Sequence, residues 1–364
     1  MKIGILGAGQ LGRMLAIAGY PLGHQFGFSG NTNNEPSSLL GHMFALEDNA
    51  EHIESLAVFS DVITYESENT NVETVREINK NVRVYPGEKS LFTTQHRGRE
   101  KAIFDQLKIP CAPYQMVNSL TDLENAISNI GLPAILKTAT EGYDGKGQFV
   151  IKTNDQITDA WNSMNGVESI LEGFVNFKRE LSLIAVRGVD NDHKYYPLVE
   201  NTHHNGILRL TIAPAQDIDP VLQETAKDYM HALLDEMGHV GVLTIELFET
   251  DNGLVVNEMA PRVHNSGHWS IEGANTSQFE NHVRAITDMP LGDTTPTHAL
   301  SAMINIIGET GPTDIALGMP NAHLHLYDKE ERADRKLGHI NITASSQAEL
   351  DSSIEKLSAF LPKS

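Results

Sequence analysis

Short apolar runs alternate with amphipathic segments along the N-terminal part of the chain. The segment Val72–Lys80 is one predicted amphipathic helix. Four apolar runs are predicted strands: Ile3–Leu6, Gln25–Phe28, Val62–Tyr65 and Val82–Tyr85. Strands that alternate with helices indicate a parallel sheet with right-handed connections. We therefore expect an α/β protein whose first domain, residues 1–93, is Rossmann-like.

The same alternation continues beyond residue 94. A helix is predicted over Gln95–Leu107, and for Arg99 in it we favour a solvated face. Further predicted strands are Tyr114–Val117, Ala134–Lys137, Phe149–Ile151, Ser169–Glu172, Glu180–Arg187 and Tyr195–Val199. Prolines at 110–113 and 290–296 mark junctions. We expect a central domain over residues 94–296, with a flexible subdomain at about 113–175, and a small C-terminal domain over 297–364.

Two neighbouring apolar strands near residue 250 carry acidic side chains. Glu246 lies in the run Gly241–Leu247, and Glu258 follows the run Gly253–Val256. Adjacent strands would place the two carboxylates side by side, where they repel unless a cation or a proton lies between them. Magnesium takes oxygen ligands and binds through one or two carboxylates plus substrate phosphates. The sequence therefore predicts a magnesium site at Glu246 and Glu258.

A glycine-rich loop follows the strand that ends in Lys137. The loop runs from Glu141 to Gln148 and places three glycines around Lys146. Glycines let backbone N–H groups approach phosphate oxygens closely, and lysine adds a point charge. The spacing differs from a Walker A loop. We interpret the loop as a phosphate-binding element, with a plain hairpin loop as the alternative.

Polar residues concentrate at two further places. Arg262 begins a dense run of donors after Pro261, and a basic cluster between Lys329 and Arg335 precedes a strand. The cluster suggests an anion site, with a mixed-charge hairpin as the alternative.

Where a strand meets a connection near Glu172, backbone groups are placed to read an adenine edge, and Glu180 is placed to bind ribose hydroxyls.

The first turn, Gly7–Gly12, matches the pattern G-x-G-x-x-G. A dinucleotide site also needs an acidic residue near the end of the second strand. That position holds a polar loop, with Glu35 late, so an NAD-binding module is disfavoured. The free N–H groups of a helix N-terminus still suit an anion. Glu66 lies at a strand edge where ligands bind, although an exposed loop acid explains it equally well.

The composition of the chain limits which kinds of molecule it can bind and in which compartment it is expected. The chain has 364 residues and a net charge of −21, which argues against nucleic acid and anionic membranes as partners. Its single cysteine, Cys111, excludes an intrachain disulfide and fits a reducing compartment, so we expect a cytoplasmic protein. No uncharged apolar stretch is long enough to span a bilayer.

These motifs together resemble the ATP-grasp superfamily. Within it, four segments are similar to the 5-(carboxyamino)imidazole ribonucleotide synthetase family: Gly9–Gly12, Glu141–Gln148, Ala260–His268 and Arg335–His339. The resemblance covers nearly the whole chain. It implies an ATP-grasp fold with a Rossmann-like pre-ATP-grasp domain and a small C-terminal domain, usually in a homodimer. It also implies carboxylation of 5-aminoimidazole ribonucleotide from ATP and bicarbonate, giving ADP and phosphate.

The resemblance also implies roles by motif position. ATP would contact Arg97, Lys137, Gly142, Tyr143, Asp144, Gly145, Lys146, Gly147, Gln148, Glu172, Gly173, Phe174, Val175, Glu180, His203, Asn257 and Glu258. The ribonucleotide and the carboxylating intermediate would contact Gln10, Leu11, Glu66, Arg262, His264, Asn265, Ser266, Lys329 and Arg335. Catalysis would involve Tyr143, Asp144, Arg262, His264 and Lys329, with Asp144 as the candidate acceptor of the amine proton. Glu141 stands where the family usually has glycine.

Two other functions stay open at this stage. One is another ATP-grasp ligase, which would act on formate or an amino acid and would share the ATP half of the site. Only the residues expected to bind the acceptor, at 262–268 and 329–335, argue against it. A nucleotide-binding regulatory protein without turnover is the second, although such a protein need not keep both Glu246 and Glu258.

The loop Glu141–Gln148 yields a first prediction. Three glycines make one fixed conformation entropically costly, so we expect an open loop that folds over the phosphates when ATP binds. Protease cleavage near Lys146 should be suppressed by an ATP analogue with magnesium. Glu141→Gly should tighten ATP binding or raise turnover, because Glu141 adds a negative charge and a Cβ at the hinge. Equal protease resistance in both states would contradict the closure.

Overall fold

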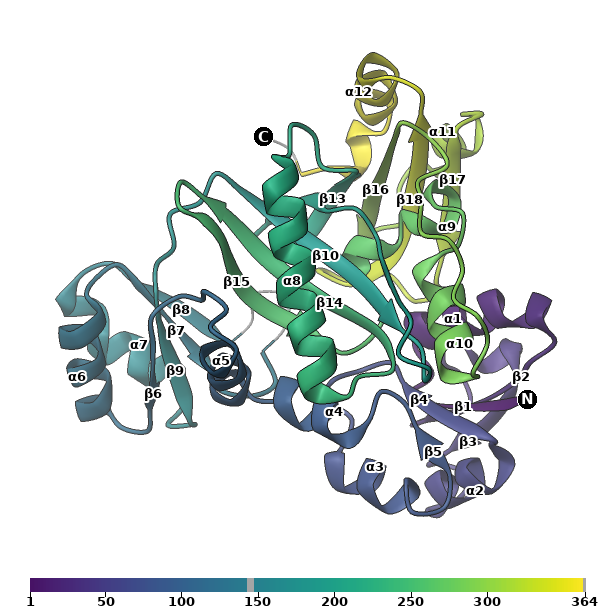
Figure 1. The fold of residues 1–364 in the computed structure, drawn as a ribbon, viewed down its shortest axis with the longest axis horizontal. Helices are drawn as coiled ribbons and strands as arrows, with labels where there is room; N and C mark the ends of the chain where they lie inside the picture. The colour runs from purple at the N-terminus through teal and green to yellow at the C-terminus, as the bar shows by residue number, and fades with distance from the viewer. Residues whose placement is uncertain (143–146, 363–364) are drawn as a thin grey trace.

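The computed structural model describes residues 1–142 and 147–362 and contains three sheets (Figure 1). The N-terminal sheet is wholly parallel, with strand order β3-β2-β1-β4-β5. Its strands are β1 (Lys2–Leu6), β2 (Gln25–Gly30), β3 (His42–Ala45), β4 (Val62–Tyr65) and β5 (Arg83–Val84). Its helices are α1 (Gln10–Gly19), α2 (His52–Phe59), α3 (Val72–Ile78) and α4 (Glu88–Thr94). The predicted parallel sheet is confirmed, with the edge strand β3 added.

A four-stranded antiparallel sheet lies apart from the other two at the left of Figure 1. Its order is β6 (Tyr114–Val117), β9 (Ser169–Gly173), β7 (Ala134–Thr138) and β8 (Gln148–Ile151). Helices α6 (Leu120–Ile130) and α7 (Ile157–Ser163) pack on it through a small separate core. Every one of these strands was predicted from its apolar pattern.

The largest sheet is antiparallel and has nine strands. Its path is β15 (Gly253–Ala260), β14 (Gly241–Thr250), β10 (Arg179–Arg187), β12 (Val199–His204), β13 (Ile207–Ala213), β16 (Leu300–Ile307), β18 (Lys336–Ala344) and β17 (Ala322–Leu326). Strand β11 (His193–Tyr195) pairs with β10 beside this path. The sheet therefore continues without a break from the central part of the chain into its last part.

One predicted strand of this sheet is wrong. Residues 196–198 of the predicted run Tyr195–Val199 form a link between β11 and β12, because Pro197 has no N–H for a ladder. The hairpin of β12 and β13 was missed, although Asn205-Gly206 between them is a strong hairpin signal. Both turn residues have positive φ, 52° and 77°.

Two helices cover opposite faces of the large sheet. Leu181 and Leu183 of β10 pack in one core with α8 (Pro220–Met237), whereas Ile184 and Val186 pack in another with α10 (Gln278–Ile286). This alternation follows from the period of two along a strand. The remaining helices are α5 (Arg97–Gln106), α9 (Ser270–Gly273), α11 (Thr313–Leu317) and α12 (Gln347–Lys356). In Figure 1, α8 crosses the front of β10 and β14.

A β-bulge interrupts the pairing of β14 with β15. Leu247 lies opposite Val256, but the next residue along β14, Glu246, lies opposite Glu258, so Asn257 is the extra residue. Leu247 and Val256 both face the core beneath α8. A regular ladder would have placed Asn257 opposite Glu246 and would have turned Glu258 towards that core.

Buried histidines link the N-terminal sheet to the large one. His282 of α10 is 1% exposed, its Nδ1 accepts the N–H of Val242 at 3.1 Å, and its Nε2 lies 2.9 Å from the hydroxyl of Thr64 in β4. This arrangement leaves no place for a second proton, and burial with the nearby His239 lowers the pKa of His282 to about 3.

Among the helices that the structure describes, we find none long and apolar enough to cross a membrane.

His282 predicts a pH-dependent stability. Its pKa lies below the ordinary value, so its contribution is complete above about pH 6.5 and declines as the pH falls towards 3, at about 1.4 kcal/mol per pH unit. His282→Gln should remove this slope, so the difference in unfolding free energy between parent and variant should shrink between pH 6 and 4. Urea denaturation measures it. The exposed His298→Gln is the control, and an unchanged slope in His282→Gln would refute the prediction.

Candidate active site

The paired carboxylates predicted from the sequence are neighbours in the structure. Glu246 of β14 and Glu258 of β15 face each other across the ladder, at the position set by the bulge. Burial and the adjacent Glu258 raise the pKa of Glu246. Burial would also raise the pKa of Glu258, but Arg97 outweighs it and lowers that pKa, with its Nη1 2.9 Å from Glu258 Oε2. The two neighbouring carboxylates therefore have pKa values that are shifted in opposite directions.

Helix α5 supplies three of the charged groups next to this pair. Arg97 begins the helix and also reaches the carbonyl of Gly142 at 3.5 Å. Lys101 is 1% exposed, and its Nζ donates to the carbonyl of the bulge residue Asn257 at 2.7 Å. Glu100 accepts the N–H of Met259 at 2.6 Å, and burial raises its pKa to about 8. The sequence pattern did not reveal Lys101 and Glu100 as buried residues.

Arg99 lies away from the site, where its guanidinium stacks 3.7 Å above the ring of Phe92. Phe92 is itself exposed. Arg99 is only partly exposed, and its Nε is shielded from solvent without a hydrogen-bond partner, so the solvated position that we favoured is met only in part.

Glu172 forms a buried charge cluster with two lysines. Its Oε2 lies 3.0 Å from Lys137 Nζ and 3.4 Å from Lys101 Nζ. Burial would raise the pKa of Glu172, but the lysines lower it to about 2. Glu172 Oε1 is shielded from solvent and has no hydrogen-bond partner. An orphaned carboxylate oxygen beside a lysine is a ready acceptor for a ligand N–H.

A cleft of about 470 Å³ opens in front of these groups. The predicted ATP residues that line it are Arg97, Lys137, Gly142, Gln148, Glu180, His203, Asn257 and Glu258. Phe177 and Phe248, which sequence reasoning missed, form one wall with stacked rings whose centroids are 4.6 Å apart. They come from the connection before β10 and from β14, and their spacing in the chain carries no recognisable motif.

His203 and Glu180 form a further pair in the cleft, with Nδ1 2.7 Å from the carboxylate. Although burial opposes it, Glu180 and the acidic pair raise the pKa of His203. The backbone N–H groups of Gly173 and Phe174 donate to Pro113 and Pro133. Glu172, Gly173, Phe174 and Val175 are not among the lining residues, so these four predicted contacts stay untested.

The glycine loop is described only at its ends. Tyr143, Asp144, Gly145 and Lys146, which we predicted to bind ATP and to close over the acceptor, lie outside the described residues. Glu141 has a φ of 62°, and Gly147 has a φ of 70°. Both values lie in the left-handed region that favours glycine, so Glu141 holds a backbone conformation that a glycine would adopt with less strain.

A second pocket of about 290 Å³, which we call the acceptor-side pocket, adjoins the cleft. The predicted residues Gln10, Leu11, Glu66, Arg262 and Asn265 line it, together with others that the sequence did not single out: Ser67, Glu68, Asn69, His268, Tyr327 and Lys336. Four residues line both cavities: Glu68, Arg262, Asn265 and Lys336. The two cavities therefore meet at these side chains.

Arg262 makes a two-pronged ion pair at this junction. Its Nη2 lies 2.8 Å from Glu68 Oε1, and its Nε contacts Glu68 Oε2. Burial would raise the pKa of Glu68, but Arg262 lowers it to about 2. In the structure the guanidinium of Arg262 thus holds both oxygens of a protein carboxylate that follows β4, and its predicted contact with a substrate stays untested.

Glu66 occupies the N-terminal glycine turn. Its two carboxylate oxygens accept the N–H groups of Gly9 at 2.6 Å and Gly12 at 2.7 Å. A Cβ on Gly9 would approach Glu66 Oε1 to 2.7 Å, so this close packing needs glycine. The anion that we expected at the helix N-terminus is therefore a side chain of the protein, and it occupies the N–H groups of Gly9 and Gly12.

His264 connects the acidic pair to the acceptor-side pocket. Its Nδ1 accepts the N–H of Ser266 at 3.3 Å, which leaves the ring proton on Nε2, 3.4 Å from Glu246 Oε1. Burial and the nearby Arg262 lower the pKa of His264 to about 3. Ser266 is fully buried, and it contacts the His264 ring through its N–H group and its hydroxyl. The side-chain amides of Asn265 and Asn305 exchange hydrogen bonds of 2.6 and 3.1 Å.

Lys329 bridges the C-terminal part of the chain to helix α1. Its Nζ donates to Gln10 Oε1 at 2.5 Å. Burial and the nearby Arg335 lower the pKa of Lys329 to about 8. Arg335 itself donates to the carbonyl of Glu330 at 3.1 Å. Lys329 thus contacts a residue that lines the acceptor-side pocket, but neither Lys329 nor Arg335 lines it, so the predicted anion site stays a prediction.

Comparison with known proteins places these features in a family. Three family models match the chain: the ribonucleotide synthetase preATP-grasp domain at residues 1–95, the ATP-grasp domain at residues 102–279, and the phosphoribosylaminoimidazole carboxylase C-terminal domain at residues 301–353. The N5-carboxyaminoimidazole ribonucleotide synthase of Pseudomonas aeruginosa is 45% identical over 362 residues, which cover 99% of either chain. Its Escherichia coli counterpart is 37% identical and covers 99% of this chain and 95% of its own.

Solved structures agree. The N5-carboxyaminoimidazole ribonucleotide synthetase of Thermus thermophilus superposes with a TM-score of 0.94 at 43% identity, covering 100% of this chain and 99% of its own. The Aspergillus clavatus N5-carboxyaminoimidazole synthase, in complex with ADP and 5-aminoimidazole ribonucleotide, gives 0.90 at 30% identity, with coverage of 98% and 97%. The chain therefore belongs to the N5-carboxyaminoimidazole ribonucleotide synthase family of ATP-grasp ligases.

Proposed function

We propose that the protein carboxylates 5-aminoimidazole ribonucleotide to N5-carboxyaminoimidazole ribonucleotide, with ATP and bicarbonate, in purine biosynthesis. The observation that carries this proposal is the junction of two cavities at Arg262, Asn265, Lys336 and Glu68. One cavity has the acidic pair and the lysines that a nucleotide needs, and the other has the basic groups that an acceptor phosphate needs. The complex of the Aspergillus clavatus relative with ADP and 5-aminoimidazole ribonucleotide supports two adjacent ligand sites.

ATP would bind in the larger cleft. Its adenine would lie beside the Phe177–Phe248 stack, and Glu172 Oε1 would accept a hydrogen bond from the exocyclic amine. Lys137 would neutralise phosphate charge, and the loop from Gly142 to Gln148 would cover the phosphates. Glu180 and His203 would bind the ribose hydroxyls.

The acidic pair suits magnesium by the chemistry of its donors. Glu246 and Glu258 offer two carboxylates on one face, and two carboxylates this close repel each other unless a cation or a proton lies between them. A bound magnesium would neutralise charge that develops on the transferred phosphoryl group. Arg97 would then be released from Glu258 to contact a phosphate, which is the role expected for it.

Bicarbonate is a poor electrophile until it is phosphorylated. Its attack on the γ-phosphorus forms carboxyphosphate and releases ADP, and carboxyphosphate then transfers its carboxyl group to the amine with loss of phosphate. Arg262 would hold carboxyphosphate at the junction of the cavities, with His264 beside it. Asp144 would accept the amine proton, and Tyr143 would help to exclude water when the loop closes.

The acceptor would lie between the N-terminal and C-terminal parts of the chain. Gln10 and Leu11 line its pocket, and Lys329 and Arg335 would bind its phosphate. We further propose domains at residues 1–93, 94–296 and 297–364, and a cytoplasmic homodimer, from the resemblance to the family and, for the cytoplasm, from the single cysteine.

A coupled assay of ADP release tests the proposed reaction. ADP release should require bicarbonate and 5-aminoimidazole ribonucleotide together for full rate, and the ribonucleotide should gain one carboxyl group from labelled bicarbonate. A panel of other acceptors, including formate and amino acids, is the control. Faster ADP release with one of these acceptors would assign a different ATP-grasp reaction.

Glu258→Gln should lose nearly all activity in this assay while the protein stays folded. Removal of one charge from the acidic pair costs several kcal/mol of transition-state stabilisation, which corresponds to at least about a hundredfold in kcat. Glu249→Gln, further along β14 and away from the cleft, is the matched control. Activity of Glu258→Gln within a few-fold of the parent at saturating magnesium would refute the metal assignment.

Arg262→Ala should spare ATP affinity but reduce turnover with the ribonucleotide by about tenfold to a hundredfold. A lost charge-assisted contact costs about 1.5 to 3 kcal/mol. Arg262→Lys keeps the charge but lacks the fork that contacts both oxygens of Glu68, so it should recover only part of the rate. The Michaelis constants of all substrates and the Kd of ATP are the measurements. A loss confined to ATP affinity would place Arg262 in the nucleotide site.

A further inference from the structure

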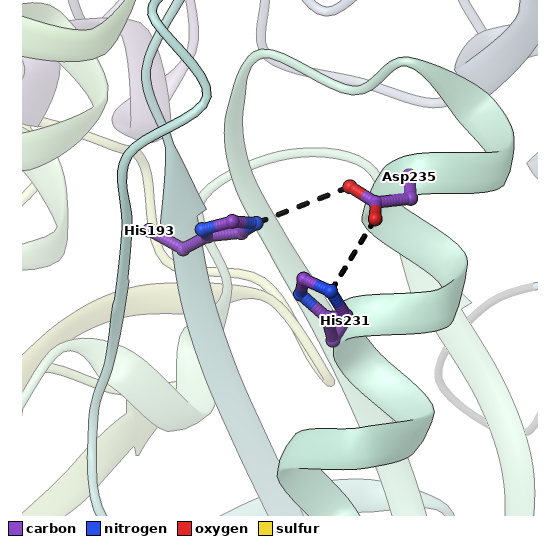
Figure 2. A group of neighbouring side chains, drawn as sticks. All are labelled: His193, His231 and Asp235. Atoms are coloured by element: carbon purple, nitrogen blue, oxygen red, sulfur yellow. Dashed lines mark ion pairs between the residues drawn. The ribbon is translucent and has the colours of Figure 1, made fainter.

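Three side chains far from the cleft gather on the outer face of the large sheet. His231 and Asp235 lie one turn apart on α8, and His193 begins β11 (Figure 2). Figure 2 shows both imidazoles directed at the carboxylate of Asp235. His231 Nε2 lies 3.3 Å from Asp235 Oδ2, and His193 Nε2 lies 3.9 Å from Asp235 Oδ1. In the part of the chain that the structure describes, no other trio of His, Cys, Asp or Glu brings its ligand atoms within 4.8 Å.

The spacing approaches that of a tetrahedral zinc site. Bonds of about 2.0–2.1 Å to nitrogen and oxygen place neighbouring ligand atoms about 3.3 Å apart. His231 and Asp235 already have that separation, and small rotations of the side chains would bring His193 as close. His193 Nε2 is shielded from solvent and has no hydrogen-bond partner, which is the state of a nitrogen that a metal would satisfy.

The surroundings orient the three ligands. Tyr195 OH lies 3.5 Å from His231 Nδ1, so the opposite nitrogen, Nε2, points to Asp235. Arg187 lies 3.6 Å from Asp235 Oδ1 and leaves Oδ2 available. Partners of this kind behind the ligands fix ring orientation and the direction of the carboxylate lone pairs.

The local charge also allows a cation. Arg187 faces the cluster as a positive group, 3.6 Å from Asp235 Oδ1, and Asp235 supplies the negative charge among the three ligands. Asp192 and Asp228 are close enough to influence the pKa values of His193 and Tyr195. His231 and Asp235 lie in the last two turns of α8, where the helix dipole favours positive charge.

We propose that His193, His231 and Asp235 form a surface site for Zn²⁺, with water as the fourth ligand. Imidazole nitrogen and carboxylate oxygen are ligands that zinc accepts, whereas magnesium prefers oxygen alone. The site would join the hairpin of β10 and β11 to α8, and it is independent of the proposed reaction. Bound zinc would therefore stabilise this side of the sheet without entering the cleft.

Isothermal titration of the metal-free protein with zinc chloride tests the site, in excess magnesium chloride. The parent should bind one equivalent more tightly than His231→Gln and Asp235→Asn do, by at least tenfold. His231 and Asp235 are about half exposed, so these substitutions should leave the fold intact. The exposed His323→Gln on β17 is the control and should bind zinc as the parent does.

Cobalt(II) supplies a second readout that does not depend on activity. Four-coordinate Co²⁺ absorbs visible light much more strongly than hydrated Co²⁺, so the parent and His323→Gln should show the band, and His231→Gln should not. Zinc should also raise the thermal midpoint of the parent more than that of either cluster variant. Equal zinc affinity in the parent, His231→Gln and Asp235→Asn would overturn the proposal.

Discussion

One extra residue in β15 determines the geometry of the acidic pair. Strand side chains alternate with a period of two, so the bulge at Asn257 is what turns Glu258 to the same face as Glu246. Two buried residues of α5 hold the irregular segment, because Lys101 binds the carbonyl of Asn257 and Glu100 binds the N–H of Met259. The cleft thus depends on a helix that clamps the irregular part of a strand.

The same clamp ties the sheets together. Lys101 from α5 and Lys137 from β7 share one oxygen of Glu172 in β9, while Lys101 also holds the bulge in β15. Loss of one partner would leave a buried charge uncompensated, at a cost of about 3–5 kcal/mol. We infer that these ions set the relative position of the four-stranded and nine-stranded sheets at the nucleotide cleft.

Sequence reasoning located what a strand end or a glycine spacing encodes. It placed Glu246 beside Glu258, Lys137 at the end of β7, and Arg262 after β15, because each follows a local apolar pattern. It could not find Lys101, whose helix reads as solvated, since burial there depends on elements more than 150 residues away in the chain, such as the carbonyl of Asn257.

Other misses have the same cause. Glu68 is an ordinary loop acid in the sequence, and its role emerges only from Arg262, 194 residues further on. Phe177 and Phe248 lie in separate segments and form one wall of the cleft only through the pairing of β10 with β14.

The hairpin of β12 and β13 was predictable, because Asn205-Gly206 is a local signal that outweighs the apolar pattern around it.

In the N-terminal glycine turn, a side chain of the protein occupies the position where a dinucleotide-binding protein would hold a phosphate. Glu66 accepts the N–H groups of Gly9 and Gly12, so the helix terminus that would hold a pyrophosphate is already neutralised. Glu66 also lines the acceptor-side pocket, where its charge would repel a phosphate. A phosphorylated acceptor would therefore gain from positive side chains near the pocket. Lys336 lines that pocket, and Lys329 contacts Gln10 beside it, where burial, with Arg335 nearby, lowers the pKa of Lys329.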